Sequence, residues 1–116
     1  MLPRALVLLD RDGVINMDRF DYVKSIDEWV PIPGSLQAIR DIYDKYDVAI
    51  CTNQSAIGRG IVSKSDVDAI HQKMANLIDL PGDNSIPVYI CPHQPVDNCS
   101  CRKPKTGLLD SAILDL

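Results

Sequence analysis

Short runs of consecutive apolar residues alternate with longer segments in which apolar residues recur every three or four positions. The runs lie at residues 5–9, 48–51 and 88–90. Polar residues do not alternate with apolar ones inside them, which is typical of strands covered on both faces. We therefore predict three buried β-strands.

The segment after residues 33–35 (PGS) has the pattern of an amphipathic helix. Its apolar and aromatic residues lie at offsets of three and four, which places them on one helical face. They are Leu36, Ile39, Ile42, Tyr43 and Tyr46. We predict that this helix follows the first strand and packs on the sheet.

Two further helices are predicted. The first starts near Ser63, because Ser63 and Asp66 have capping-box spacing with Asp in place of Glu. It ends at residues 80–82 (LPG). Its apolar stripe is Val67, Ile70, Met74, Leu77 and Ile78. The other helix runs from about Thr106 to the C-terminus.

Strands that alternate with helices predict an α/β fold with a parallel sheet. Ligands of such folds bind at the carboxyl ends of the strands. The polar clusters at residues 10–13 (DRDG) and 52–55 (TNQS) follow the first and second predicted strands. We therefore expect a ligand site built from these two clusters.

Composition narrows the function classes. The chain has 116 residues, which we interpret as one domain over residues 1–116, and it is 46% hydrophobic and 24% charged. Its formal net charge of −4 argues against a general nucleic-acid binder. No apolar run approaches the roughly 20 residues that cross a bilayer, and no signal peptide is recognisable. We expect a soluble cytoplasmic protein.

The acids of the first cluster are candidates for chemistry. Asp10 and Asp12 are two residues apart at a strand end, and Gly13 lets the chain turn away. Two such carboxylates suit a magnesium site, or a nucleophile with a general acid/base. The alternative is a turn with solvated acids, since Asp and Gly are common turn residues.

The other polar residues suit phosphate binding. Thr52, Asn53, Gln54 and Ser55 offer hydroxyl and amide donors, and Arg59 follows them. Residues 102–105 (RKPK) precede the last helix, where Lys103 would neutralise a phosphate and Arg102 would grip one with its planar guanidinium. The alternatives are a polar loop without a ligand and a solvated charged face.

Four potential metal ligands lie within eleven residues. Cys91, His93, Cys99 and Cys101 give C-x-H-x5-C-x-C, a complete tetrahedral set that favours a structural zinc ion. The alternatives are free thiols with a surface His, or a disulfide, which the cytosol disfavours. Of the residues outside these clusters, we interpret Cys51 as a buried apolar residue and His71 as an ordinary helix residue, and we leave Trp29 open between core and pocket.

The order of Asp10-x-Asp12-Gly13, Thr52 and Lys103 resembles the first three motifs of the haloacid dehalogenase superfamily of phosphatases. Within it, the chain resembles the heptose bisphosphate phosphatases. The matching stretches are residues 10–16, 28–29 with 33–34, 52–60 and 91–107. The last two stretches are the most specific.

The resemblance implies a Rossmann-like fold and a reaction. Asp10 would attack phosphorus and form an aspartyl phosphate, and Asp12 would protonate the leaving oxygen and then activate water. Mg²⁺ would bind the Asp10 carboxylate and the Asp12 main-chain carbonyl. Thr52 and Lys103 would hold the phosphoryl oxygens. The implied substrate-binding residues are Asp18, Arg19, Asp21, Asn53, Gln54, Ser55 and Arg102.

The same resemblance implies that the enzyme removes the 7-phosphate of a heptose 1,7-bisphosphate, a step towards ADP-heptose and the lipopolysaccharide core. The zinc ion of Cys91, His93, Cys99 and Cys101 would be structural and would brace the loop that leads to Arg102 and Lys103. The implied partner is a small sugar bisphosphate, with no nucleic acid and no membrane. We expect a monomer, although no sequence feature determines the oligomeric state.

Two features depart from the superfamily. Its fourth motif, paired acids after another strand that complete the magnesium site, has no counterpart before Leu116. The strand that carries it lies beside the first strand, so its loss would leave an open sheet edge. We expect a fragment of a longer protein, with little magnesium-dependent activity at this length.

Three rival functions remain. A histidinol-phosphate phosphatase shares D-x-D-G and the spacing of the zinc loop. A non-catalytic module that binds zinc and phosphate belongs to a different class. A nucleic-acid end phosphatase is disfavoured by the acidic charge and the zinc loop.

Overall fold

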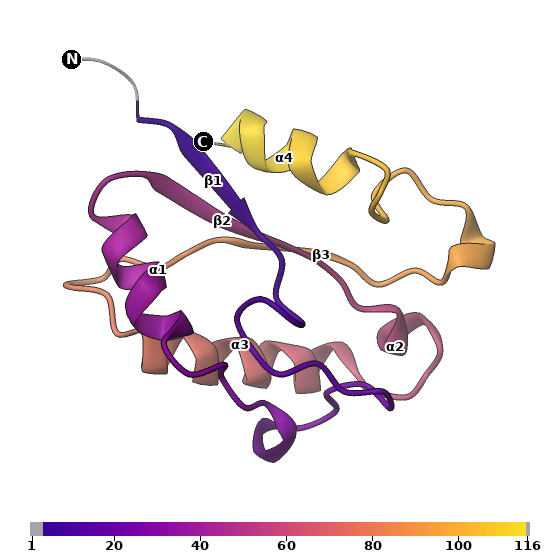
Figure 1. The fold of residues 1–116 in the computed structure, drawn as a ribbon. Coiled ribbons are helices and arrows are strands. Elements are labelled where there is room, and N and C mark those ends of the chain that lie inside the picture. The colour runs from indigo at the N-terminus through magenta and orange to yellow at the C-terminus, as the bar shows by residue number, and fades with distance from the viewer. Residues whose placement is uncertain (1–3, 116) are drawn as a thin grey trace.

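The computed structural model describes residues 4–115 and contains one parallel sheet. Its strands are β1 (Leu6–Leu9), β2 (Asp47–Asn53) and β3 (Val88–Cys91), with β2 in the centre (Figure 1). Leu8 pairs with Ala49 of β2, and Cys51 of β2 pairs with Tyr89 of β3. The three predicted strands and their parallel arrangement are confirmed, and β2 extends two residues beyond its predicted end.

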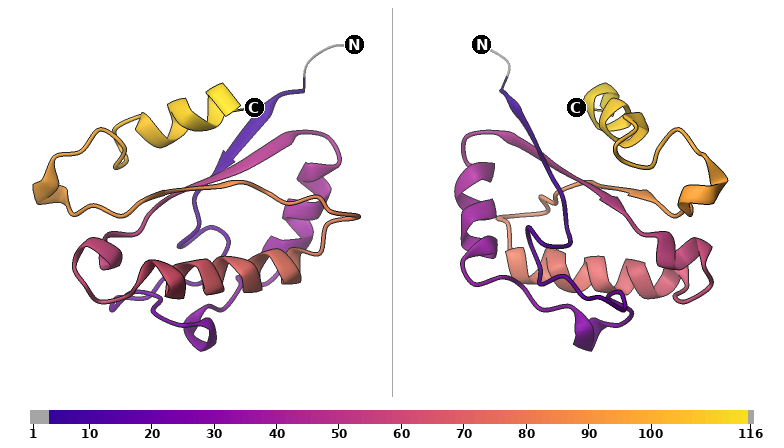
Figure 2. Two further views of the ribbon diagram at one scale, coloured as in Figure 1. Left: turned by 180° about the vertical axis from the view of Figure 1, so that it is seen from behind. Right: turned by 45° about the vertical axis from the view of Figure 1, so that its right-hand side comes forward.

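Helices cover both faces of this sheet (Figure 2). One face carries α1 (Ser35–Tyr43) and α3 (Lys64–Ile78), and the other carries α4 (Gly107–Asp115). The α/β class predicted from the sequence is confirmed. Because both faces are covered, the central strand is buried over almost its whole length, which explains its unbroken apolar run.

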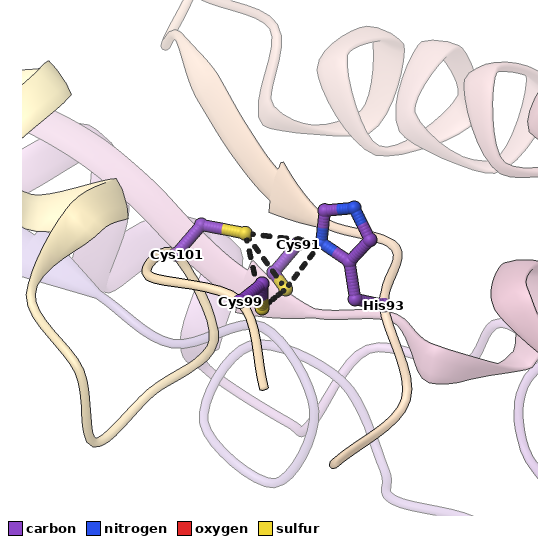
Figure 3. A group of neighbouring side chains, drawn as sticks. All are labelled: Cys91, His93, Cys99 and Cys101. Carbon is purple, nitrogen blue, oxygen red and sulfur yellow. Dashed lines mark hydrogen bonds between the residues drawn. The ribbon is translucent and has the colours of Figure 1, made fainter. Parts of the chain in front are cut away.

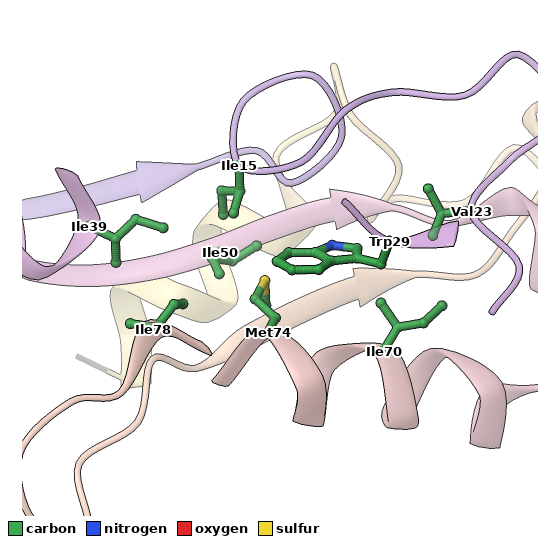
Figure 4. Close-up of a cluster of buried hydrophobic side chains, with 8 residues drawn as sticks. All are labelled: Ile15, Val23, Trp29, Ile39, Ile50, Ile70, Met74 and Ile78. Atoms are coloured by element: carbon green, nitrogen blue, oxygen red, sulfur yellow. The ribbon is translucent and has the colours of Figure 1, made fainter. Parts of the chain in front are cut away.

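The larger core cluster lies between the sheet and the layer of α1 and α3 (Figure 4). It consists of Ile15, Val23, Trp29, Ile39, Ile50, Ile70, Met74 and Ile78. Trp29 is fully buried, so it belongs to the core and does not line a pocket. Under α4 a smaller cluster contains Cys51, which is buried as predicted.

The capping box of α3 forms as its spacing predicts. Ser63 Oγ accepts a hydrogen bond from the Asp66 backbone N–H, and an Asp66 carboxylate oxygen accepts one from the Ser63 N–H, both at 3.1 Å. The prediction that Leu77 is buried was wrong, because it is 43% exposed. The buried stripe runs through Met74 to Ile78, and Leu77 lies beside that stripe.

The prediction for Tyr46 was also wrong. Helix α1 ends at Tyr43, and the chain turns directly into β2 at Asp47, so Tyr46 lies outside the helix and is 41% exposed. Three short elements were not predicted at all: η1 (Ile26–Glu28), α2 (Ser55–Gly58) and η2 (Pro95–Asp97). At three or four residues, each is too short to show a helical period.

Within residues 4–115, no helix combines the length and the apolar character that crossing a membrane requires.

Candidate active site

The carboxyl ends of the strands bring the predicted polar clusters together. Asp10 follows β1 directly, Thr52 and Asn53 are the last residues of β2, and Ser55 begins α2. Residues 102–104 reach the same edge from the loop between β3 and α4. Together these segments border an open cleft of about 610 Å³.

The cleft contains most of the predicted site residues. Its lining consists of Asp10, Asp12, Asp18, Arg19, Tyr22, Val23, Asn53, Gln54, Ser55, Arg102, Lys103 and Pro104. Of the predicted catalytic and substrate-binding residues, only Thr52 and Asp21 are outside this set. Tyr22 belongs to the loop that was expected to touch substrate and Pro104 to the charged segment 102–105, whereas the sequence reasoning did not anticipate Val23 as a lining residue.

An ion pair occupies the floor of the cleft. Lys103 Nζ lies 2.9 Å from Asp10 Oδ1, and the same oxygen accepts a hydrogen bond of 2.8 Å from the Arg11 backbone N–H. The Asp10 side chain is 47% exposed. The carboxylate is therefore oriented through one oxygen and open to the cleft.

Asn53 positions Lys103 through two hydrogen bonds. Its Oδ1 accepts from the Lys103 backbone N–H at 3.0 Å, and its Nδ2 donates to the Lys103 carbonyl at 3.2 Å. Both polar atoms of the amide are engaged, so in this structure Asn53 fixes the backbone that carries Lys103. The sequence had suggested it only as a substrate ligand.

Thr52 and Gln54 form a buried pair behind the cleft. Thr52 is 1% exposed, and its Oγ1 accepts a hydrogen bond of 2.8 Å from Gln54 Nε2. Because Oγ1 is the acceptor in this contact, the Thr52 hydroxyl retains its proton for another partner. The other amide atom of Gln54, Oε1, accepts from Arg11 Nη2 at 3.2 Å.

An ion-pair network holds the segment from residue 18 to residue 28 on one side of the cleft. Arg19 pairs with Asp21 at 3.1 Å and with Glu28 at 3.0 Å, and Lys24 pairs with the same two acids. The hydrogen bonds from Lys24 and then from Arg19 lower the pKa of Asp21. In this structure Asp21 therefore holds Arg19, which itself faces the cleft.

Sequence reasoning missed the hydrogen bonds that surround Asp12. Arg11 is fully buried and points Nε and Nη2 at Asp12 Oδ1, at 2.9 and 2.7 Å. Asn16 Nδ2 donates to the same oxygen at 3.0 Å, and Gln54 Nε2 donates to Asp12 Oδ2 at 3.1 Å. A signal was present, because an Arg between two acids at a buried strand end needs a buried partner.

The arginine also contacts His71, which the sequence suggested was an ordinary helix residue. Its Nη1 lies 3.1 Å from His71 Nε2, which belongs to α3. Burial, followed by the charge of Arg11, lowers the pKa of His71 to about 4. This ring is therefore neutral near pH 7. His71 lies in α3 as expected, and its contact with Arg11 was not anticipated.

The cysteine–histidine cluster lies in the loop after β3 (Figure 3). The potential ligand atoms of Cys91, His93, Cys99 and Cys101 all lie within 4.8 Å of one another and face a common centre. The sulfur–sulfur distances are 3.0–3.5 Å, against about 3.8 Å for thiolates around tetrahedral zinc with 2.3 Å bonds. A small outward movement would accommodate the ion, so this cluster fits a metal site.

The ionisation of these thiols differs between positions. Burial, assisted by the neighbouring Cys101 thiol, raises the pKa of Cys91 to about 12. Burial opposes ionisation of Cys99 too, but the backbone N–H of Arg102 and the neighbouring thiols lower the pKa of that residue to about 6. A bound cation would favour the thiolate form at every position and release protons.

Comparison with known proteins assigns the family. A family model described as polynucleotide kinase 3 phosphatase matches residues 6–116. A D-glycero-beta-D-manno-heptose-1,7-bisphosphate 7-phosphatase from Haemophilus ducreyi is 38% identical over 128 aligned positions, which cover 99% of this chain and 67% of the relative. The chain belongs to the heptose bisphosphate phosphatase branch of this family. A relative of the same name from Neisseria meningitidis is 46% identical over 109 residues, 93% of the chain.

The heptose bisphosphate phosphatase fold is also found among solved structures. The D,D-heptose 1,7-bisphosphate phosphatase of B. bronchiseptica, solved with magnesium and phosphate, matches with a TM-score of 0.87 and 41% identity. The match covers 97% of this chain and 64% of that chain. It confirms the fold expected from the haloacid dehalogenase motifs. The chain spans 58% of the length of the Neisseria relative.

A rival family is represented more weakly. The histidine biosynthesis bifunctional protein HisB of Legionella pneumophila is 34% identical over 110 residues, which cover 93% of this chain and 31% of that protein.

Proposed function

We propose that the protein containing this chain is a phosphatase that removes the 7-phosphate from D-glycero-beta-D-manno-heptose 1,7-bisphosphate. The observation that carries this proposal is the contact of 2.9 Å between Asp10 and Lys103 beside Asp12, at the carboxyl ends of two parallel strands. A nucleophile, a phosphate-binding cation and a proton donor are thereby within reach of one phosphoryl group. The names of the relatives supply the sugar and the beta anomer.

In this mechanism a carboxylate oxygen of Asp10 attacks phosphorus, and the bond from phosphorus to the sugar oxygen breaks. Asp12 gives its proton to the departing oxygen, which leaves as the sugar hydroxyl. Asp12 then takes a proton from the water that hydrolyses the aspartyl phosphate. The water oxygen bonds to phosphorus as the bond from phosphorus to Asp10 breaks, so the two steps together regenerate the Asp10 carboxylate and the protonated Asp12 and leave inorganic phosphate as the second product.

Positive charge and hydrogen bonds hold the transferring group. Lys103 already lies against Asp10, so a phosphate that enters the cleft meets a cation at the point of attack. The retained hydroxyl proton of Thr52 would be donated to a phosphoryl oxygen. Asp18, Arg19, Ser55 and Arg102 line the cleft and would contact the sugar and its second phosphate.

The Asp10 carboxylate and the Asp12 main-chain carbonyl would hold Mg²⁺. Both are oxygen ligands of the kind that this cation prefers, and Asp10 Oδ2 has no hydrogen-bond partner among residues 4–115. The bound ion would supply positive charge that offsets repulsion between the Asp10 carboxylate and the phosphate.

The Cys91, His93, Cys99 and Cys101 cluster would hold a structural Zn²⁺ ion. Four ligands complete a tetrahedral set and leave no position for substrate, so the ion has no step in the reaction. The cluster immediately precedes Arg102 and Lys103 in sequence. Its function would be to hold the loop that presents these two cations.

We further propose a cytoplasmic enzyme whose product is used for the lipopolysaccharide core, and whose only partner in the reaction is the small-molecule substrate. The second candidate is a histidinol-phosphate phosphatase, which the 34% identity to HisB favours. A nucleic-acid end is disfavoured as the substrate, because the net charge of −4 gives the chain no general basic character.

The test measures phosphate release by the protein containing this chain, with Mg²⁺ present. We expect kcat/KM for the heptose bisphosphate to exceed that for histidinol phosphate by about 100-fold or more. Asp10→Asn should reduce kcat by more than about 10³-fold, because an amide is a poor nucleophile. Asp110→Asn, an equal charge change on exposed α4, is the control and should leave kcat unchanged. Preference for histidinol phosphate, or turnover by Asp10→Asn, would contradict the proposal.

A further inference from the structure

The group closest to the proposed acid is a buried cation. Arg11 has no exposed side-chain surface, and it lies between Asp12 of its own loop and His71 of α3. A guanidinium in this environment is stable only when its N–H groups have partners. Three of its nitrogens have one: Nε and Nη2 donate to Asp12, Nη2 also donates to Gln54, and Nη1 faces His71.

The contact with His71 determines which form of the imidazole is present. An arginine can only donate, so His71 Nε2 must accept and its proton must reside on Nδ1. The lowered pKa of His71 is consistent with this neutral tautomer, because a second ring proton would point at the guanidinium. Asp68 and Asp12, the acids that favour a charged ring, are outweighed by burial and by Arg11.

The hydrogen bonds to Asp12 are distributed unequally over its two oxygens. Oδ1 receives three donors, two from Arg11 and one from Asn16. Oδ2 receives one, from Gln54 Nε2. Since Oδ1 is saturated, the proton that Asp12 transfers is carried by Oδ2, and the carboxyl group cannot rotate without breaking three hydrogen bonds.

We propose that Arg11 and His71 are positioning residues for Asp12: His71 Nε2 holds the guanidinium in the orientation that fixes Asp12 Oδ1, and this leaves Oδ2 as the oxygen that protonates the leaving group. The inference rests on the proposed function, because it assumes that Asp12 is the acid. Neither residue contacts the substrate. The link runs from α3 through the core side of the loop to the cleft.

The experiment compares two substrates that differ in their need for an acid. The alkyl oxygen of the heptose bisphosphate must be protonated as it leaves, whereas the phenolate of 4-nitrophenyl phosphate leaves without help. The value of kcat/KM reports on the steps up to phosphoryl transfer to Asp10. It therefore does not depend on the later step in which Asp12 activates water. Asp12→Asn establishes the signature of a lost acid, a large loss for the alkyl substrate and a small one for the aryl substrate.

His71→Leu removes the acceptor at similar size and should show the same signature. We expect kcat/KM for the heptose bisphosphate to fall about 10- to 100-fold, and that for 4-nitrophenyl phosphate to change by less than about 3-fold. His71→Gln should restore the alkyl activity, since its Oε1 reaches the position of Nε2 and accepts from Arg11. Gln72→Leu, at the exposed neighbouring position of α3, is the control.

A second pair of variants keeps the test decisive if His71→Leu does not fold. Both His71→Asn and His71→Gln introduce a polar amide. The shorter Asn places its amide near the position of Nδ1 and does not reach Arg11, whereas the amide of Gln does reach Arg11. His71→Gln should retain activity on the heptose bisphosphate and His71→Asn should lose it, although the circular dichroism spectra of the two variants match. If the role of His71 were merely structural, its replacement would lower kcat/KM for both substrates by the same factor.

The outcomes distinguish failure of the positioning proposal from failure of the proposed function. If the wild type turns over the heptose bisphosphate and Asp12→Asn gives the signature, but folded His71→Leu or His71→Asn does not, the positioning proposal is overturned and the proposed function stands. If the wild type does not turn over the heptose bisphosphate, the proposed function fails, and the positioning proposal fails with it.

Discussion

At the scale of single residues, Trp29 contributes most to the core. It is the only tryptophan of the chain, and it packs between α3 and the segment that follows β1 (Figure 4). Lys73 donates hydrogen bonds to the carbonyls of Ile26 and Trp29 at 2.7 and 2.9 Å, and its ammonium lies 5.7 Å from the centre of the indole ring. The indole Nε1 has no partner within residues 4–115, so the ring contributes through packing and its contact with the Lys73 ammonium, and not through a hydrogen bond of its own.

Replacement of this ring should therefore depend on volume and not on polarity. Trp29→Ala should lower the free energy of unfolding by about 3–5 kcal/mol, because it leaves a large cavity. Trp29→Phe should cost clearly less, since it keeps most of the packing and removes the unpartnered N–H. The measurement is urea unfolding followed by circular dichroism. Phe20→Ala, at a fully exposed aromatic, is the control and should change the value by less than about 0.5 kcal/mol. An equal loss in Trp29→Phe and Trp29→Ala would contradict the dependence on volume.

At the scale of elements, the loop between β3 and α4 connects the metal cluster to the cleft. Lys105 Nζ bridges Asn98 Oδ1 and the Cys99 carbonyl, at 2.7 and 2.9 Å. Gly107 begins α4 so close to the loop that a Cβ there would lie 2.6 Å from the Cys101 Cα and from the Ser100 carbonyl oxygen. The start of α4 is therefore packed directly against the cluster, and a change in the loop reaches Lys103.

Metal removal tests this connection. We expect one zinc ion per chain by elemental analysis of protein purified without added metal. Its removal by a chelator should lower Tm and increase hydrogen exchange over residues 91–103, because the remaining contacts hold the loop weakly. Cys99→Ser should lose the ion, whereas Cys51→Ala, a buried cysteine outside the cluster, should keep it. Protein with far less than one zinc ion per chain and an unchanged Tm after chelation would contradict the assignment.

The sequence predicted the elements better than the contacts between them. Short apolar runs placed the three strands, and apolar residues at helical spacing placed the helices α1, α3 and α4, because burial imposes both patterns on the chain. The four-residue helix α2 carries no period and was missed. At the site, residue types and strand ends brought Asp10 and Lys103 together correctly, but the two hydrogen bonds by which Asn53, a residue of the cleft lining, holds the Lys103 backbone were not anticipated. Such pairings depend on the packing of segments far apart in the chain, which a local pattern does not record.

At the scale of the whole molecule, several polar contacts join the layer of α1 and α3 to the segment after β1. Lys73 donates to the carbonyls of Ile26 and Trp29, and Ser35 Oγ donates to the Ile15 carbonyl. The contact that includes a titratable ring is the one from Arg11 to His71. Apolar packing surrounds this contact on the α3 side, where Met74 and Ile70 are buried. The stability of the molecule is therefore linked to the protonation state of His71. The direction of that link follows from its pKa.

This histidine should make the protein less stable in mild acid. Its pKa is about 4 in the folded state, against an ordinary value of 6.5. Above pH 6.5 both states are neutral, so His71 has no effect on stability. As the pH falls from 6.5 to 4, the unfolded chain binds a proton that the folded chain does not bind, so stability decreases and then levels off below pH 4.

The loss attributable to this group is at most roughly 3 kcal/mol. Asp21, Glu28 and Asp66, whose pKa values are lowered, begin to lose their contribution as the pH falls through their ordinary values of 3.8, 4.5 and 3.8, at the acidic end of this range and below it. His71→Gln keeps the acceptor for Arg11 and removes the titration, so the difference in unfolding free energy between wild type and variant, measured in urea from pH 7.5 to 4, isolates the effect. That difference should shift in favour of the variant as the pH falls below 6.5. A difference that stays constant over this range would mean that His71 is protonated equally in both states and that the ring does not accept from Arg11.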